Sequence, residues 1–158
     1  MKLSSQEEYG LRCLLQVARA GEGKSLTIGE LSKLEGISSP NVAKIMRVLR
    51  KTNLVKSTRG QSGGYTLARP VDQISVGEAL AALGGRLYDS GFCDRHSGQA
   101  LCCTHLPDCS IRPVLRQLQT VVDQVLGALT LKNLLCTEHE VTWASPRAVP
   151  LPLAVRTN

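Results

Sequence analysis

The chain has 158 residues, 42% of them apolar and 3% aromatic, and its formal net charge is +6. This length fits one compact domain, or a small domain with a helical extension. No apolar run approaches the roughly 20 residues that span a bilayer, and no secretory signal precedes the first charged segment. We therefore expect a cytoplasmic protein with no membrane partner. The scarcity of aromatic side chains argues against a stacking platform for single-stranded nucleic acid.

The positive charge is concentrated in one part of the chain. Residues 38–69 include no acidic residue, whereas seven are basic: Lys44, Arg47, Arg50, Lys51, Lys56, Arg59 and Arg69. From residue 70 onward the charges nearly balance, with seven basic residues and eight acidic ones. A basic block of this kind indicates a polyanionic partner, and double-stranded DNA is the first candidate. A solvated positive face is the alternative interpretation.

Helix signals follow one another through the first half of the chain. Ser4 or Ser5 can cap a first helix, because a glutamate follows each at the spacing of a capping box. A short second helix begins at Thr27 and ends near Gly36. Ser39, followed by a proline, begins a third helix. The buried stripe expected for this third helix is Val42, Ile45, Met46 and Leu49.

A hairpin and a fourth helix follow. The β-prone runs 54–58 and 65–68 flank a glycine-rich turn, and Ser75 begins a helix that stops at Gly84. Two short helices joined by a tight turn and followed by a basic hairpin describe a winged helix-turn-helix. The sequence therefore predicts a mostly α fold with a two-stranded wing, in which residues 1–85 form the DNA-binding domain.

The third helix is the expected reader of the major groove, because its first turns can reach base edges. Ser39 is expected to serve both as helix cap and as DNA contact. At the hairpin tip, Arg59 can enter a minor groove or pair with phosphate. The full candidate set for DNA contact is Ser38, Ser39, Asn41, Lys44, Arg47, Arg59 and Gln61.

The second half of the chain contains a cysteine cluster and a long helix. Residues 86–109 show no periodicity and hold four cysteines, Cys93, Cys102, Cys103 and Cys109. In a cytosolic chain such a cluster indicates metal or redox chemistry. Residues 110–136 carry a heptad-like apolar row, which predicts a long C-terminal dimerisation helix: Leu115, Leu118, Val122, Val125 and Leu129. Residues 137–158 are rich in proline and small residues and are expected to be a disordered tail.

Several of these motifs match a known family. Residues 36–38 (GIS), 49–55 (LRKTNLV), 58–67 (TRGQSGGYTL) and 74–79 (ISVGEA), with the cysteine loop before a long helix, closely resemble the bacterial winged-helix regulators that include IscR, NsrR and RirA. The resemblance implies a homodimeric transcription factor, more often a repressor, whose operator affinity depends on an iron–sulfur cluster. No phosphate loop, Cys-x-x-Cys pair or nucleophile–base pattern points to an enzyme.

The resemblance also implies a ligand set. Cys93, Cys103 and Cys109 match the three family cysteines, although the adjacent Cys102 is an alternative to Cys103. Some relatives place a histidine three residues past the last cysteine, where this chain has Arg112. Others use a carboxylate on the first helix of the partner subunit, and that position is Glu8.

Glu8 shares a helical face with Leu11 and Leu15, so its carboxylate can point toward buried surface. Its alternative role is an ordinary capping-box glutamate. His96 and His105 are the next candidates for the fourth ligand. A site of three cysteines and one carboxylate resembles those of the [4Fe-4S] members, so the resemblance favours that cluster, although [2Fe-2S] members with an oxygen ligand exist.

The same cysteines are also consistent with two other kinds of regulator. A tetrahedral zinc site could combine them with His96, although no Cys-x-x-Cys knuckle is present. A clusterless regulator could sense through its thiols. The signal itself, whether iron supply, redox state or nitric oxide, stays open.

Overall fold

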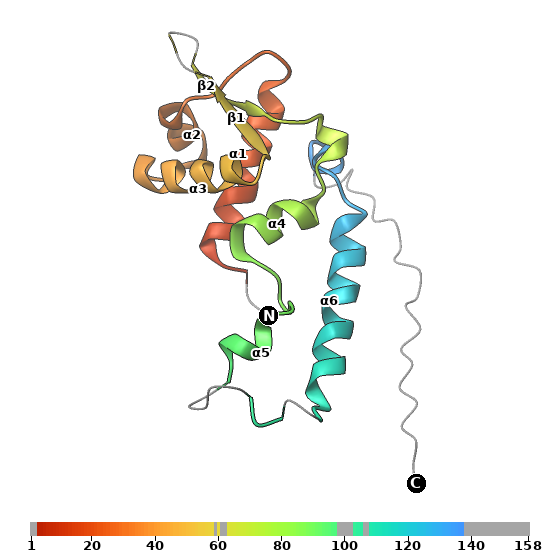
Figure 1. The fold of residues 1–158 in the computed structure, drawn as a ribbon. Coiled ribbons are helices and arrows are strands. Elements are labelled where there is room, and N and C mark those ends of the chain that lie inside the picture. The colour runs from red at the N-terminus through yellow and green to blue at the C-terminus, as the bar shows by residue number, and fades with distance from the viewer. Residues whose placement is uncertain (1–2, 59, 61–62, 98–102, 106–107, 138–158) are drawn as a thin grey trace.

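The computed structural model of the chain describes residues 3–58, 60, 63–97, 103–105 and 108–137. Its elements in chain order are α1 (Ser5–Ala20), α2 (Ile28–Glu35), α3 (Ser39–Lys51), β1 (Val55–Thr58), β2 (Gly64–Leu67), η1 (Val71–Gln73), α4 (Val76–Gly84), α5 (Phe92–Arg95), α6 (Ile111–Gly127) and η2 (Leu131–Leu134). Helices α1 to α3 and the β hairpin gather at one end of the molecule, and α6 extends away from them (Figure 1). The predicted fold class, a mostly helical winged helix-turn-helix with a two-stranded wing, is confirmed.

Helix α1 is the centre of the packing. Its N-terminus is closed by a capping box, in which the Ser4 hydroxyl accepts from the Glu7 amide and the Glu7 carboxylate accepts from the Ser4 amide. Its buried side makes contact with α2, α3, α4 and β2. The approach of α4 is so close that a Cβ at Gly10 would collide with the Leu83 side chain. Helix α1 therefore links α2, α3 and the wing to α4 and the second half of the chain.

The turn between α2 and α3 depends on one glycine. Gly36 has φ +66°, in the left-handed region that side chains disfavour. The N-cap of α3 is Ser38, whose side chain makes no capping hydrogen bond, so the prediction that Ser39 caps this helix is wrong. Proline in the first turn fixes φ at a helical value and starts the helix without a side-chain cap. The predicted stripe of Val42, Ile45, Met46 and Leu49 is buried, as expected.

The wing is an antiparallel pair in which Val55 lies opposite Leu67 and Thr58 opposite Gly64. The loop before α2 adds to it, because Leu26 and Tyr65 exchange two backbone hydrogen bonds of 3.0 and 2.8 Å. A Cβ at Gly64 would lie 2.9 Å from the Leu26 backbone, so glycine permits this approach. Arg59 and Gln61, predicted to contact DNA, lie outside the described residues, as do Cys102 and the predicted tail from residue 138.

The chain returns to the winged domain after α6. The Val76 amide donates to the Leu129 carbonyl at 2.8 Å, and the Leu131 amide donates to the Ile74 carbonyl at 2.9 Å. Leu131 is fully buried in the core, and Leu129 is also buried within the chain. Leu129, which the heptad spacing placed on the dimer seam, therefore packs inside its own subunit. In the part of the chain that the structure describes, no helix combines the length and apolarity needed to cross a bilayer.

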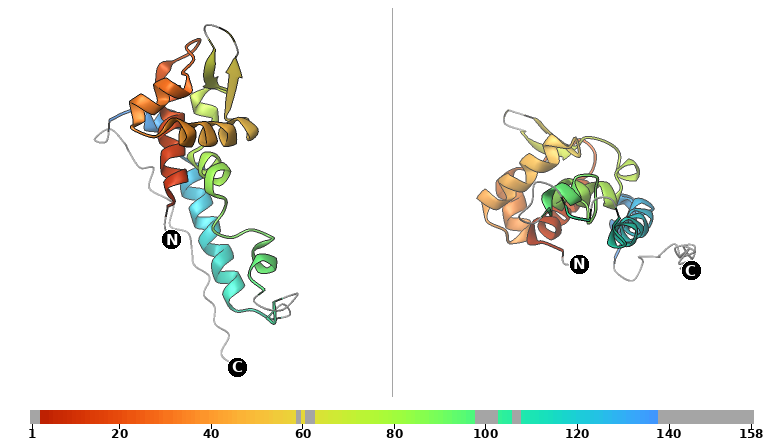
Figure 2. Two further views of the ribbon diagram at one scale, coloured as in Figure 1. Left: turned by 90° about the vertical axis from the view of Figure 1, so that its left-hand side faces the viewer. Right: turned by 60° about the horizontal axis from the view of Figure 1, so that its bottom comes forward.

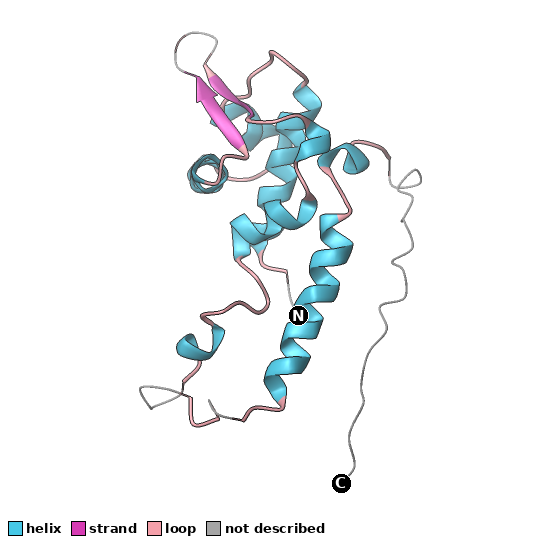
Figure 3. Ribbon diagram, turned by 45° about the vertical axis from the view of Figure 1, so that its right-hand side comes forward, coloured by secondary structure: helices cyan, strands magenta, loops and turns pink. Residues whose placement is uncertain are grey.

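The cysteine segment leaves α4 at Gly85 and runs beside the N-terminal half of α6. Two views show the short helix α5 next to α6, at the end of the molecule away from the wing (Figures 2 and 3). The sequence predicted no regular element between residues 86 and 109, whereas the structure has this single turn. The segment thus places Cys93 and Cys109 near α6, at the end of the molecule away from α3 and the wing.

Candidate functional sites

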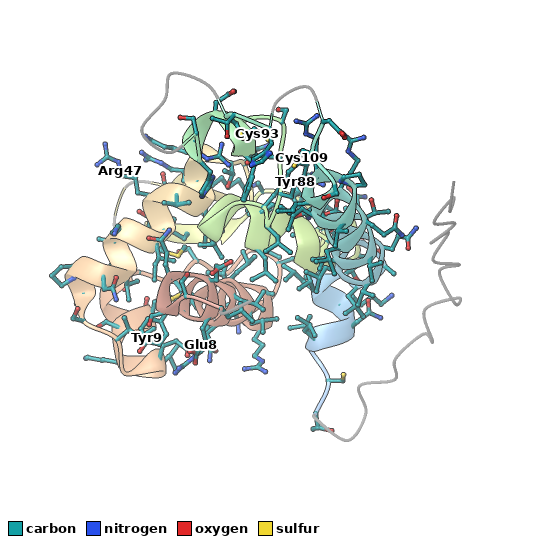
Figure 4. All side chains as sticks on the ribbon, turned by 90° about the horizontal axis from the view of Figure 1, so that it is seen from below. Glu8, Tyr9, Arg47, Tyr88, Cys93 and Cys109 are labelled. Atoms are coloured by element: carbon teal, nitrogen blue, oxygen red, sulfur yellow. The ribbon has the colours of Figure 1, made fainter. Side chains whose placement is uncertain are left out.

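The exposed side of α3 carries a row of cations. Lys44 and Arg47 are exposed, and Lys51 continues the row at helical spacing. The Arg47 side chain projects away from the body of the molecule (Figure 4). Ser38 and Ser39 are exposed where α3 begins, while Asn41 is half-buried. The five predicted contacts on this helix therefore lie on or beside one accessible edge.

A buried carboxylate fastens the helix-turn-helix to α1. The Glu35 side chain is 7% exposed and receives a 2.6 Å hydrogen bond from Arg12 Nε and another of 2.6 Å from Gln16 Nε2. Arg12 Nη2 also donates to the Glu35 backbone carbonyl at 2.9 Å. A charge can be buried when it is paired and hydrogen-bonded in this way. Because Glu35 is the last residue of α2, Arg12 and Gln16 fix the point where the chain turns into α3.

Glu8 occupies a different environment from the one predicted. Its side chain is 61% exposed and lies 3.5 Å from Arg12, so the expectation that it points toward buried surface is wrong for the single chain. The capping box is made by Glu7, which leaves Glu8 without that role. Glu8 and Glu35 therefore share one arginine, with Glu35 the nearer and more buried partner.

The candidate cluster ligands of the cysteine segment are half-buried thiols. Cys93 lies on α5, Cys109 lies two residues before α6, and Cys103 lies between them. All three are free cysteines of intermediate exposure. Cys93 also lines an open cavity of about 760 Å³ between the segment and α6, which arginines and aspartates of both elements surround. Soft, partly sheltered thiols are the donors that iron–sulfur clusters require, so the donor set fits such a group.

The described residues of one copy do not assemble a complete ligand set. Among the described residues, no three histidine, cysteine or acidic side chains come close enough to hold a metal ion. Figure 4 shows Glu8 and Tyr9 on the side of the molecule away from Cys93 and Cys109. The Glu8 carboxylate would therefore have to come from a second copy to join these cysteines.

The alternative fourth ligands differ in their surroundings. His96 Nδ1 lies 2.8 Å from the Phe92 carbonyl, and its ring stacks on the Phe92 ring at 4.2 Å. A carbonyl accepts only, so Nδ1 carries the proton and Nε2 is the unprotonated nitrogen of the neutral ring. His105 is exposed. Arg112, at the position where some relatives have histidine, lines the cavity beside Cys93.

Cys13 is separate from this site. It is fully buried in α1, and burial, with a smaller effect from the nearby Glu35 charge, raises the pKa of its thiol to about 11. A thiol held neutral in a core is a structural residue and a poor metal ligand.

Helix α6 exposes an apolar row. Ile111, Val114 and Leu118 are 63%, 52% and 48% exposed, at spacings of three and four residues. Leu118 belongs to the predicted seam, whereas Ile111 and Val114 extend the row toward the start of the helix. A single chain leaves this row in water, which is the arrangement expected of a surface that another subunit covers.

The sequence gives no sign that Glu35 is the buried carboxylate that joins α2 to α1. Its partner Arg12 is 23 residues away, and no local pattern marks a glutamate near a helix C-terminus as buried. Only the crossing of α1 and α2 brings the two together.

Comparison with known proteins gives a consistent result. A family model described as "Rrf2: Iron-dependent Transcriptional regulator" matches residues 3–137. The chain is 32% identical over 135 residues to Protein rrf2 of Nitratidesulfovibrio vulgaris, covering 85% of this chain and 87% of that protein. It is 32% identical over 140 residues to the HTH-type transcriptional regulator IscR of Sodalis glossinidius, covering 88% and 81%.

Solved structures share the fold. IscR of T. potens aligns with a TM-score of 0.65 at 26% identity, covering 85% of this chain and 86% of that one. CymR, described as the global cysteine regulator of B. subtilis, aligns with a TM-score of 0.65 at 24% identity, covering 85% and 96%.

Proposed function

The chain belongs to the Rrf2 family of transcriptional regulators, and from this premise we propose that it is a repressor whose affinity for a specific operator is set by an iron–sulfur cluster. Membership makes it a DNA-binding regulator and not an enzyme. The observation that carries the cluster proposal is the set of free, half-buried thiols in the segment beside α6. Cys93, Cys103 and Cys109 would hold the cluster, with a [4Fe-4S] form favoured.

Glu8 is the proposed fourth ligand, supplied by the partner subunit. Its exposed carboxylate is not used for capping, and it lies away from Cys93 and Cys109 of its own chain. A cluster bound there supplies redox-active iron that also reacts with nitric oxide. Iron supply, redox state or nitric oxide would then be the signal.

DNA contact is proposed at the exposed edge of α3 and at the wing. Lys44 and Arg47 would neutralise phosphates or reach guanine edges, while Ser38, Ser39 and Asn41 would position the start of the helix in the major groove. Arg59 and Gln61, between the two strands of the wing, would contact the neighbouring DNA phosphates or minor groove. The basic block of residues 38–69 supports this interface, because it contains no acidic residue.

A homodimer is proposed because α6 leaves Ile111, Val114 and Leu118 exposed on one face. Two copies joined there would present two copies of α3 to half-sites about one helical turn apart. Val114→Glu would place a charge on this surface and should yield monomers in sedimentation. A Val114→Glu protein that still sediments as a dimer would assign assembly to another face.

The contacts of Arg12 provide a way in which cluster ligation by Glu8 would change operator binding. Arg12 is shared by Glu8 and by Glu35 at the α2–α3 turn. When Glu8 is engaged elsewhere, Arg12 keeps only its contacts with Glu35 and Tyr9, and the turn is held more firmly. Small displacements of α3 in a dimer would weaken operator binding, because both half-sites must be met at once.

The test is anaerobic purification of the full chain, followed by visible absorption and iron, sulfide and zinc analysis. We expect brown protein, and little or no cluster in Cys93→Ala, Cys103→Ala and Cys109→Ala. Cys102→Ala, Cys13→Ala and Cys136→Ala are the matched controls and should keep the cluster. Glu8→Ala should retain part of the colour but lose cluster-dependent control of operator binding, because a carboxylate is a harder and more exchangeable ligand than a thiolate.

Other results would redirect the proposal. Colourless protein loaded with zinc would assign a zinc regulator, and metal-free protein whose DNA affinity follows thiol oxidation would assign a clusterless sensor. If Glu8→Ala equals the wild type in spectrum, cluster lifetime and DNA response, His96 or His105 becomes the favoured fourth ligand.

A further inference from the structure

Gln119 is buried in the middle of α6, although it is polar. Taken as a whole residue, Gln119 is 7% exposed, which places it in the buried class. Its Oε1 accepts from the Tyr88 backbone N–H at 2.9 Å, and its Nε2 donates to Asp123 Oδ1 at 2.7 Å. The other oxygen of Asp123 pairs with Arg86. Gln119 thus joins α6 to the chain that enters the cysteine segment.

The chemistry of these partners fixes which residue can stand here. An N–H can only donate and an ionised carboxylate can only accept, so the amide must face Tyr88 with its oxygen and Asp123 with its nitrogen. A leucine would fill similar space but would leave the Tyr88 N–H unpaired beside the helix. A glutamate would keep the acceptor for Tyr88 but set a second carboxylate against Asp123.

The residues after Tyr88 form a self-bonded unit that carries Cys93. Asp89 accepts from the Gly91 amide at 2.8 Å and from Arg95 at 2.7 Å, and the guanidinium of Arg95 lowers the pKa of the Asp89 carboxyl. The Phe92 ring lies 5.2 Å from the Tyr88 ring, and its amide donates to the Asp89 carbonyl. Residues 88–95 therefore form one hydrogen-bonded unit, and Gln119 attaches its first residue to α6.

The two ends of the cysteine segment are held to α6 in different ways. Cys109 is tied covalently, because it precedes the first residue of α6 by two positions. Cys93 has no such tie, and the Tyr88–Gln119 hydrogen bond is the attachment that precedes it by five residues. Gln119 lies eight residues along α6, roughly 12 Å from its start at 1.5 Å per residue. The separation of Cys93 from Cys109 thus depends on this contact, together with the Arg86–Asp123 ion pair two residues earlier in the segment.

We infer that Gln119 is a positioning residue of the cysteine site, which holds the unit 88–95 and its Cys93 thiol at a fixed place on α6. The part of this inference that concerns cluster retention rests on the proposed function. The part that concerns the position of the Cys93 thiol stands without it. The exposed row of Ile111, Val114 and Leu118 lies on the neighbouring face of α6, since one residue turns the helix by about 100°. The same helix thereby connects the thiol to the proposed subunit contact.

The test measures the rate at which iodoacetamide alkylates each cysteine of the metal-free full-length chain, resolved by peptide mass spectrometry. We expect Gln119→Leu and Gln119→Glu to raise the alkylation rate of Cys93 at least about threefold. Cys136, whose Sγ contacts the Asn133 carbonyl at the opposite end of α6, is the internal control and should not change. The double variant Gln119→Glu with Asp123→Asn exchanges amide and carboxylate and should lower the Cys93 rate again toward the wild-type value, with the new amide at position 123 facing Arg86 through its oxygen.

Unchanged Cys93 rates in both single variants would overturn the inference. So would an equal rise at Cys136, which reports general loosening, or a double variant no slower than Gln119→Glu. A measurement on the wild type guards against variants that do not fold. Its Tyr88 amide should exchange with solvent at least about tenfold more slowly than in an unstructured peptide, and free exchange there would also overturn the inference.

A second readout follows the cluster in reconstituted protein. Under an EDTA challenge, Gln119→Leu should shorten the cluster half-life and the double variant should lengthen it again. If the wild type takes up no cluster, the proposed function fails while the alkylation result still decides the role of Gln119. If the cluster is retained equally in all variants but Cys93 alkylation changes, Gln119 positions the thiol of the apoprotein alone.

Discussion

Arg12→Met should destabilise the junction between α1 and the helix-turn-helix. The change keeps the apolar stem of the side chain but removes the 2.6 Å and 2.9 Å hydrogen bonds to Glu35, whose carboxylate is 7% exposed. Leaving one partner of a buried ion pair alone costs about 3–5 kcal/mol. Arg12 is itself 42% exposed, so water replaces part of its contact, and Gln16 keeps one hydrogen bond. We therefore expect a loss of about 2 kcal/mol.

That loss corresponds to about a 30-fold larger unfolding constant, and to a Tm lower by roughly 4–8 °C for a chain of this size. The assay is urea unfolding of the wild type, Arg12→Met, Glu35→Gln and the double variant, which together give the coupling energy. Glu8→Gln is the matched control. It removes the exposed 3.5 Å pair with the same arginine and should change the stability by less than about 0.5 kcal/mol. A coupling energy between Arg12 and Glu35 below about 0.5 kcal/mol would refute the reasoning.

Three further outcomes are expected. Lys44→Ala and Arg47→Ala should each reduce the slope of log affinity against log salt by about 1, and an unchanged slope would mean that these side chains face solvent in the complex. Gly10→Ala should lower the free energy of unfolding by about 1–2 kcal/mol in urea titrations, because the new Cβ meets the buried Leu83 side chain and helix propensity returns less than that. The pKa of Cys13 is raised from 9.0 to about 11 on folding, so its proton leaves the unfolded chain first, and stability should fall as pH rises through that interval. Between pH about 8 and about 10.5, the wild type should lose on the order of 2 kcal/mol more unfolding free energy than Cys13→Ala. Equal losses in the two proteins would count against a raised pKa of this thiol.

The local elements of this protein are determined by its sequence because their signals are local. The Ser4–Glu7 capping box, the proline that starts α3 and Gly60, which turns the wing with a φ of +113°, act within a few residues of themselves. The stripe from Val42 to Leu49 is likewise a matter of helical spacing, and it was found buried where the pattern put it. The basic, acid-free block of residues 38–69 is equally a property of the sequence, and it predicts which side faces DNA.

The tertiary structure decided what depends on residues that are distant along the chain. Glu8 was expected to face buried surface on the strength of the helical wheel, but the crossing of α1 and α2 buries Glu35 instead and leaves Glu8 61% exposed. Leu129 fits the heptad spacing of α6, yet the chain turns back after Gly127 and packs it into its own core. In the sequence, Gln119 is an ordinary polar residue of an amphipathic helix. Its burial follows from the hydrogen bond that it accepts from the backbone N–H of Tyr88, 31 residues earlier. Periodicity reports which face of a helix is apolar, whereas the partner that covers a face, or satisfies a buried polar group, is set by how the helices cross.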